Sequence, residues 1–364
     1  MKTLLEVLLN LRWPSNFSVA LIILSGILWL YYVYKWRMRD TLQKLKSFNS
    51  VPTVPIIGNL HIVTGSNKER AIKLYKLLTE YETPLVFKLF YKPIFIIGRS
   101  QDIQVILNKT HQRDLMGMFE MVLGDSITCL QGEKWRKHRR IVTSAFSPTM
   151  LQQYLKIFNK YSSLLTDNLK KFADNDKAIN MWSHVDHLNL LSITQNMTGH
   201  KLELGDRTNA EFIEAFNKSL GIETSRFTHP LLFLNFMYRM YLFISGKIEI
   251  FKTIRRFPRQ IVKKRLAEYE INENSNQEDK QHKEIKSSKT LIDSLLKTYS
   301  VDAAFTEKHV TAEIANMMIT GNESTSTTIN FVLLMMAMHP NIQERVYEEI
   351  KTVLGNSDRE VETE

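Results

Sequence analysis

The pattern of apolar and polar positions predicts a chain built mainly of helices. Apolar residues recur at spacings of three and four, as on one face of a helix. Residues 85–97 are β-branched and aromatic around a Lys-Pro pair and predict a hairpin. The stretch 271–290 is almost wholly polar and predicts a surface loop. The predicted fold class is therefore mainly α with a small β-sheet, with helices over 68–81, 101–109, 133–146, 150–173, 185–199, 209–220 and 247–271.

The first apolar stretch predicts a membrane anchor. Residues 17–34 contain no charge, and a helix of this length spans about 27 Å, close to the thickness of a thin bilayer. Basic residues gather between Lys35 and Lys46, so the positive-inside bias places the rest of the chain in the cytosol. A cleaved signal is the alternative, but aromatic and basic residues stand where its cleavage site would lie. We therefore expect an N-terminal signal anchor over 1–35, a basic and proline-rich hinge over 36–60, and a body over 61–364.

Composition narrows the classes of protein that remain. The 364 residues are 44% apolar and 24% charged, which is ordinary for a globular protein. The single cysteine, Cys129, excludes a disulfide framework and cysteine-rich zinc sites, and we interpret it as an ordinary buried or partly exposed thiol. A net charge of +10 favours an acidic partner or an anionic membrane surface. For a chain of 364 residues this charge is too small to predict a nucleic-acid partner.

Two further stretches have more than one interpretation. Residues 226–245 are rich in aromatic and aliphatic side chains, but they are too interrupted to span a bilayer. They form either a buried helix pair or a second contact with the membrane surface. Residues 247–265 are strongly basic, which suits anionic headgroups, an acidic redox partner, or a merely solvated face.

The basic segment 131–140 contains a candidate clamp for carboxylates. Trp135 and Arg139 are four residues apart, so on a helix they share one face. An indole N–H and the planar fork of a guanidinium that converge on one point suit carboxylate groups. The alternative is a basic surface helix whose tryptophan packs on the core.

The apolar segment 313–338 has a polar centre that a core helix does not need. Gly321 costs about 1 kcal/mol relative to alanine and lets a flat group approach the backbone. Glu323 is costly in an apolar environment unless water or a partner reaches it. The hydroxyl of Ser324 can bond to the carbonyl four residues back and open a local bulge. These residues predict a groove that delivers protons; the alternative is a core helix kinked by Gly and Ser/Thr.

The order of these features resembles the cytochrome P450 haem-thiolate monooxygenases, specifically the microsomal fatty-acid-hydroxylase clan abundant in insects. The resemblance is collinear over nearly the whole chain and implies the P450-like helical fold. It implies that Trp135 and Arg139 bind the haem propionates and that Gly321 faces the haem. It further implies that the segment Thr320-Gly321-Asn322-Glu323-Ser324-Thr325 supplies the remaining site residues, with Thr320 and Gly321 as cofactor-binding residues and Glu323, Ser324 and Thr325 as catalytic residues that relay protons to dioxygen.

Two departures from the family pattern accompany the resemblance. Thr320 stands where some members carry a glutamate esterified to haem, so covalent haem is not expected, and Ser324 stands where threonine is typical. The family also needs a Glu-x-x-Arg helix and a loop with the axial cysteine. The sequence stops at Glu364, just where the Glu-x-x-Arg helix would be expected to follow, and Cys129 lies in no such loop. No metal ligand is therefore assigned, and a C-terminally truncated chain is expected.

The resemblance implies a monooxygenase in the endoplasmic reticulum membrane with a cytosolic body. Haem would be its cofactor, and NADPH would supply electrons through a reductase. Dioxygen and an apolar small molecule would be its substrates, and membrane lipid would surround the anchor. The alternative is a non-catalytic, truncated, membrane-tethered helical protein that binds no haem. A membrane-bound hydrolase is disfavoured because neither a Gly-x-Ser-x-Gly elbow nor a His-x-x-x-His pair occurs.

Overall fold

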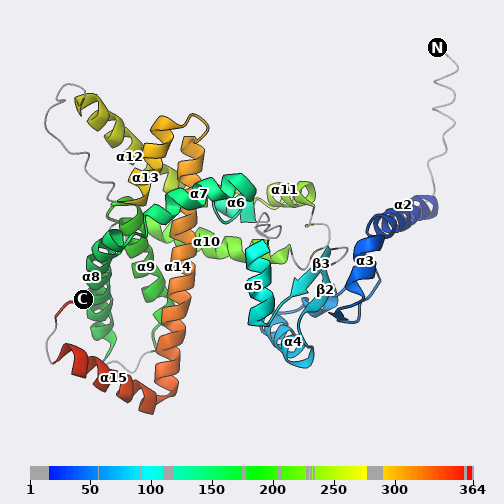
Figure 1. Ribbon diagram of the computed structural model, residues 1–364, viewed down its shortest axis with the longest axis horizontal. Coiled ribbons are helices and arrows are strands. Elements are labelled where there is room, and N and C mark those ends of the chain that lie inside the picture. Colours follow the sequence, from blue (N-terminus) through cyan, green and yellow to red (C-terminus); the bar gives the residue numbers. More distant parts are fainter. Residues whose placement is uncertain are drawn as a thin grey trace. The chain divides into compact units, whose positions relative to one another are not determined.

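The computed structural model confirms the predicted fold class, with many helices and one small sheet (Figure 1). The chain divides into two compact units, one formed by Met1–Thr110 with Ser225–Tyr238 and the other by His111–Thr224 with Arg239–Glu364. The structure describes residues 16–55, 57–89, 92–109, 119–173, 178–202, 207–226, 229, 232, 234–276, 290–355 and 359–362.

The first unit combines short helices with the sheet. Its helices form where the sequence provides a start signal, as at Ser66, whose hydroxyl and Glu69 form a reciprocal capping box. The predicted helix at 68–81 is therefore confirmed. Its elements are α2 (Asn16–Arg37), α3 (Arg39–Leu45), β1 (Asn49–Ser50), the 3-10 helix η1 (Leu60–Ile62), α4 (Asn67–Glu80), β2 (Leu85–Leu89), β3 (Lys92–Ile96) and α5 (Ser100–Lys109).

The three strands of the sheet lie in the order β1-β2-β3. β2 pairs antiparallel with β3, with Leu85 opposite Ile96, which confirms the predicted hairpin. β1 pairs parallel with β2, with Asn49 opposite Leu85. Side chains of β2 join the hydrophobic core of this unit together with Val51 and Leu77.

Part of the segment interpreted as a hinge packs on this sheet. Asn59 is fully buried, where its Nδ2 donates to the carbonyl of Pro52 at 2.8 Å and its Oδ1 accepts from the N–H of Lys88 at 2.8 Å. Gly58 has a φ of 63°, and a Cβ there would lie 2.4 Å from the carbonyl oxygen of Lys88. Only glycine fits this close approach, so the turn brings residues 51–60 onto β2.

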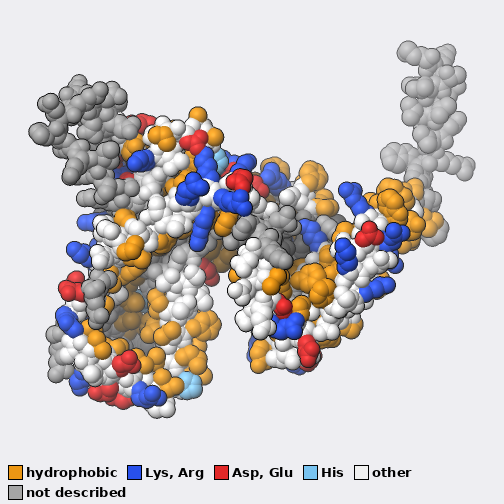
Figure 2. All heavy atoms as spheres, viewed as in Figure 1, with side chains coloured by type: hydrophobic (Ala, Val, Ile, Leu, Met, Phe, Trp, Pro, Cys, Tyr) orange, Lys and Arg blue, Asp and Glu red, His pale blue; other side chains and the backbone are white. Residues whose placement is uncertain are grey.

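The predicted anchor segment is helical, because α2 includes all of residues 17–34. Apolar side chains of α2, among them Ile22, Trp29 and Leu30, are exposed in this structure (Figure 2). The predicted transmembrane span is nevertheless not supported. No helix in the described part of the chain is both long and apolar enough to cross a membrane.

The second unit is a helical body. α14 packs most extensively against α9 and also contacts α12 and α13, while α8 packs on α9 and α7 on α13 (Figure 1). Its elements are α6 (Glu120–Leu123), α7 (Gly132–Ser144), α8 (Pro148–Ala173), α9 (Met181–Thr198), α10 (Arg207–Ser225, whose last residue belongs to the first unit), α11 (Asn235–Ile244, which begins in the first unit), α12 (Ile248–Asn276), α13 (Leu291–Val301), α14 (Glu307–Met338) and α15 (Pro340–Leu354).

The predicted helices from 101–109 to 247–271 are all present, with differences at their ends. The main difference concerns the loop predicted at 271–290, because α12 continues through Asn276. Its apolar side, which includes Phe251, Ile254 and Val262, is buried and stabilises the long helix. The remainder of that predicted loop, 277–289, lies outside the described residues.

Candidate functional site

A row of hydroxyl groups lies at the centre of α14. Thr320 Oγ1 donates to the carbonyl of Asn316 at 2.7 Å. Ser324 Oγ donates to the carbonyl of Thr320 at 2.7 Å, which confirms the predicted bond to the carbonyl four residues back. The local bulge expected there is not formed, because α14 continues unbroken from Glu307 to Met338. A carbonyl oxygen has two lone pairs and can accept both the hydroxyl and the helical N–H.

The acid beside this row is partly buried. Glu323 is half-buried, while Ser324 and Thr325 are exposed. Burial raises the pKa of Glu323, and the negative charge of Asp186 raises this pKa further. A carboxyl group whose pKa is raised holds its proton closer to neutral pH, and its partial exposure keeps it accessible. This arrangement suits a group that gives and receives protons.

Gly321 lies where α9 comes close to α14. A Cβ on this glycine would lie 3.0 Å from Cδ1 and 3.1 Å from Cγ1 of Ile193 on α9. The group that approaches Gly321 in this structure is an isoleucine side chain, and not the flat group expected from the sequence. The implied contact between Gly321 and haem stays a prediction.

A seam of polar side chains joins α9 to α14 beside Glu323. Asn322 Nδ2 donates to Asp186 Oδ1 at 2.6 Å. Asn189 Nδ2 donates to the carbonyl of Asn322 at 3.0 Å and to Ser326 Oγ at 3.2 Å. Burial raises the pKa of Asp186, whereas its hydrogen bonds from Asn322 and Ser326 oppose this effect. The seam was not predicted from the sequence, although Asp186 and Asn189 stand among the apolar positions of 185–199 and were a signal for it.

α7 presents the predicted carboxylate clamp. Trp135 and Arg139 lie four residues apart on this helix, and Trp135 is half-buried while Arg139 is exposed. Within the described part of the chain, Arg139 forms no ion pair or side-chain hydrogen bond, unlike Arg136, which pairs with Glu133. The guanidinium of Arg139 is therefore available to a carboxylate. The neighbouring His138 is buried and contacts Glu313 of α14, a pair that the basic sequence around it concealed.

A comparison with known families decides the family. The sequence model described as cytochrome P450 matches residues 49–364. The chain belongs to the cytochrome P450 family. The match includes α7, α9 and α14, so the clamp residues and the polar centre of α14 lie within it.

Individual cytochromes P450 are similar to the chain over most of its length. Cytochrome P450 4c21 of Blattella germanica is 23% identical over 331 residues, 90% of this chain and 66% of the relative. The probable cytochrome P450 312a1 of Drosophila melanogaster is 27% identical over 361 residues, 95% of this chain and 69% of the relative. Cytochrome P450 4V2 of Homo sapiens is 23% identical over 334 residues, 89% of this chain and 63% of the relative. The chain thus spans about two thirds of the length of the curated relatives it matches.

P450 membership implies a haem, and two helices carry side chains with suitable chemistry. Arg139 offers an exposed guanidinium that is unpaired among the described residues and of the kind that binds carboxylates, and the hydroxyls of Ser324 and Thr325 are exposed on α14. Both helices belong to the same unit. An axial thiolate is not among the described residues of this site.

Cys129 lies in the segment before α7, and its side chain is half-buried. Burial raises the pKa of its thiol to about 12. This finding agrees with the interpretation of Cys129 as an ordinary, partly exposed thiol.

A cavity lined by apolar and charged side chains lies between α6, α12 and the first part of α14. Its volume is about 690 Å³. Two arginines of the basic segment 247–265 line it, and both bind within the chain. Arg255 Nη2 donates to the carbonyl of Glu120 at 3.1 Å, and Arg259 Nε lies 3.5 Å from Glu307 Oε1. The apolar part of the wall is formed by Val122, Leu123, Ile248, Ala312 and Ala315.

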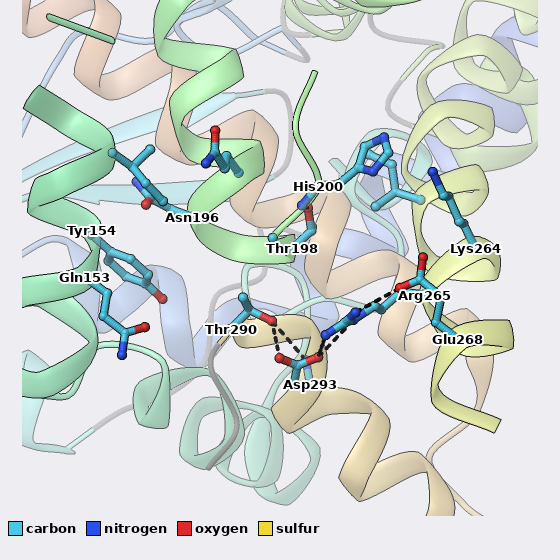
Figure 3. Close-up of a pocket in the computed structure, with 14 residues that line it drawn as sticks. Gln153, Tyr154, Asn196, Thr198, His200, Lys264, Arg265, Glu268, Thr290 and Asp293 are labelled. Atoms are coloured by element: carbon cyan, nitrogen blue, oxygen red, sulfur yellow. Dashed lines mark hydrogen bonds and ion pairs between the residues drawn. The ribbon is translucent and has the colours of Figure 1, made fainter. Parts of the chain in front are cut away.

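Another cavity, of about 360 Å³, lies between α8, α9, α12 and α13 (Figure 3). Its wall is polar. Arg265 donates from Nε and Nη2 to Asp293 Oδ1 at 3.1 and 2.9 Å, and Thr290 Oγ1 donates to Asp293 Oδ2 at 2.7 Å. In these bonds the charged groups of Arg265 and Asp293 pair with each other, and the bonds stabilise the start of α13. None of the predicted site residues lines this cavity.

Proposed function

We propose that the protein to which this chain belongs is a membrane-bound haem monooxygenase. It would insert one oxygen atom of dioxygen into an apolar substrate, with electrons from NADPH delivered by a reductase. Membership of the cytochrome P450 family supports the reaction class. The observation that carries the proposal for this chain is the centre of α14, where the half-buried acid Glu323, with its raised pKa, adjoins the exposed hydroxyl of Ser324.

In this proposal Trp135 and Arg139 hold haem by its propionates. The guanidinium of Arg139 is exposed and has no partner in the described part of the chain, which supports this role because a planar fork of donors matches a carboxylate. Thr320 and Gly321 are the proposed cofactor-binding residues of α14, and a haem beside Gly321 would have to share that space with the side chain of Ile193. When bound, the haem supplies the oxygen and electron-transfer chemistry, which the protein orients and supplies with protons.

Glu323 and Ser324 supply protons in this proposal. The hydroxyl hydrogen of Ser324 is directed to the carbonyl of Thr320, so the lone pairs of Oγ can accept a hydrogen bond, and the hydroxyl would turn from this carbonyl to pass its own proton on as it receives another. Glu323, with its raised pKa, is a suitable donor at near-neutral pH. The exposed hydroxyl of Thr325 is the third member of the group. The cavity of about 690 Å³ beside the first part of α14 has the size that a small-molecule substrate needs, and its wall combines apolar with charged side chains.

We also propose that α2 attaches the protein to the endoplasmic reticulum membrane with the body in the cytosol. The uncharged stretch 17–34, the exposed apolar side chains of α2 and the basic residues that follow it support this. Exposed Phe236, Phe243 and Ile244 of α11 support a second contact with the lipid surface. Flotation with phosphatidylcholine vesicles tests the attachment. Leu24→Asp with Ile27→Asp should abolish flotation, and wild-type chain that stays at the bottom of the gradient would refute it.

A titration with ferric protoporphyrin IX tests the haem proposal. The Soret band should shift with saturation in the wild-type chain. Arg139→Ala should weaken binding about tenfold or more, because a hydrogen bond to a charged group contributes about 1.5–3 kcal/mol. Arg136→Ala is the matched control, because Arg136 lies on the same helix and already pairs with Glu133. An equal loss in both variants would refute the clamp. Absence of saturable binding would favour the non-catalytic protein that binds no haem.

A further inference from the structure

The most deeply buried acid of the second unit is not used in the proposed chemistry. The side chain of Glu313, in the first third of α14, is 0% exposed, and that of its partner His138 on α7 is 5% exposed. His138 Nδ1 and Glu313 Oε1 are 2.6 Å apart, so one proton lies between them. The second oxygen, Oε2, has no hydrogen-bond partner among the described residues. A buried carboxyl with so few partners costs stability relative to an apolar side chain.

The surroundings of the pair fix the imidazole ring. The ring centroid of His138 lies 5.0 Å from that of Phe305 and 5.4 Å from that of His309. Phe305 and His309 in turn stack on each other with centroids 5.4 Å apart. The ring is thus confined by packing and by the bond to Glu313, and its orientation relative to α14 is set.

The pair fixes α7 next to the residues of the proposed clamp. His138 directly precedes Arg139 and follows Trp135 by three residues, so all three side chains move together when α7 turns. A shift of α7 by one residue would rotate its side chains by about 100° about the helix axis, so the side chain of Arg139 would point in a different direction. Glu313 lies on the helix that also carries Glu323 and Ser324, about 15 Å away along its axis. The hydrogen bond between His138 and Glu313 therefore joins the helix that carries the clamp to the helix that carries the proton-supplying group.

We propose that the His138–Glu313 pair positions the haem-propionate clamp by fixing the rotation of α7 on α14. The inference rests on the proposed function, because it requires Arg139 to bind a propionate. His138 and Glu313 are positioning residues: they act through α7. An apolar pair could hold the two helices together, but it would lack the directional bond.

The test replaces the pair by apolar side chains of similar size. His138→Phe with Glu313→Met keeps the ring in its stack and removes the buried polar atoms, which is often neutral for stability or better. We expect this double variant to unfold at a urea concentration close to that of the wild type. Its affinity for ferric protoporphyrin IX should fall about tenfold, as is common when an outer-shell partner is lost. Amide hydrogen exchange over 132–144 should be faster, while exchange over α8 stays unchanged.

Two further variants make the outcome specific. Glu313→Gln keeps an acceptor oxygen for His138 and should retain most of the affinity. Tyr161→Phe is the control for general loss of a buried bond, because Tyr161 Oη donates to Gln195 Oε1 at 2.9 Å between α8 and α9. Its affinity should equal that of the wild type.

The outcomes separate this inference from the proposed function. If Arg139→Ala weakens binding but the folded double variant binds like the wild type, the positioning role is refuted and the clamp stands. If Arg139→Ala has no effect, the clamp fails and the positioning role fails with it. Loss of affinity in Tyr161→Phe equal to that in the double variant would also overturn the inference, because the effect would then be general.

Discussion

Replacing Gly321 by alanine tests the closest contact between α9 and α14. The added Cβ would lie 3.0 and 3.1 Å from two carbons of Ile193, against about 3.5–4.0 Å for a favourable carbon contact. The backbone of Gly321 is not in the left-handed region, so alanine is sterically allowed there apart from this contact. Two opposing effects therefore decide the result.

The expected magnitude follows from these two effects. Alanine gains about 1 kcal/mol over glycine in a helix interior. Overpacking a core contact costs about 1–3 kcal/mol. The free energy of unfolding should therefore fall by about 0–2 kcal/mol in Gly321→Ala. Gly221 on α10 provides the matched control, because nothing lies within 4 Å of its added Cβ, and Gly221→Ala should raise the free energy of unfolding by about 1 kcal/mol.

Urea unfolding followed by circular dichroism measures the difference between the two variants. A change in midpoint without a change in slope reports stability. Ile193→Val removes the carbon nearest to the added Cβ, so it should restore part of the stability of Gly321→Ala although it costs about 0.5–1.5 kcal/mol alone. The reasoning would be refuted if Gly321→Ala stabilised the chain as much as Gly221→Ala does, because α9 would then not approach this position closely.

Three other predictions concern titratable groups. Because burial raises the pKa of Cys129 to about 12, its alkylation by iodoacetamide at pH 8 should be slow in the folded chain and fast in urea; equal rates by mass spectrometry would contradict this. Burial raises the pKa of Glu313 above its unfolded value, so its contribution to stability is complete below pH 4.5 and is lost as pH rises through the folded-state pKa. Thermal unfolding should therefore depend less on pH above 4.5 in Glu313→Gln, and an unchanged profile would count against the assignment. The negative charge of Asp186 raises the pKa of Glu323, so Asp186→Asn should lower this pKa. The infrared carboxyl band of Glu323 is identified by its loss in Glu323→Gln, and its titration should move to lower pH in Asp186→Asn. An unchanged titration would exclude the coupling.

Features that depend on local spacing could be predicted from the sequence. The hairpin of β2 and β3, the helical spacing of Trp135 and Arg139, and the bond from Ser324 to the carbonyl of Thr320 all involve residues close in sequence. Helical periodicity and the chemistry of short polar side chains determine such features without knowledge of the rest of the fold. The family resemblance was confirmed by the match over 49–364.

Contacts between distant residues could not be predicted in the same way. Gly321 indicated a close approach, but the sequence did not identify the approaching group as Ile193 of α9. His138 lies in a strongly basic run that is typical of a solvated surface, yet it is buried against Glu313, 175 residues away. A polar residue in an apolar helix announces that a partner exists, and only the packing of the helices identifies that partner.

The position of Glu323 on α14 explains how one carboxyl group can have a raised pKa and remain accessible. The preceding residue, Asn322, is buried in the seam and bonded to Asp186, while the following residue, Ser324, is exposed. Successive residues are turned by about 100° around a helix, so Glu323 lies at the border between these two environments. A carboxyl at position 322 would be buried close to Asp186, where ionisation is costly, and one at position 324 would be exposed with little reason for a shift. Among these three consecutive positions, 323 therefore best combines a raised pKa with access for proton exchange.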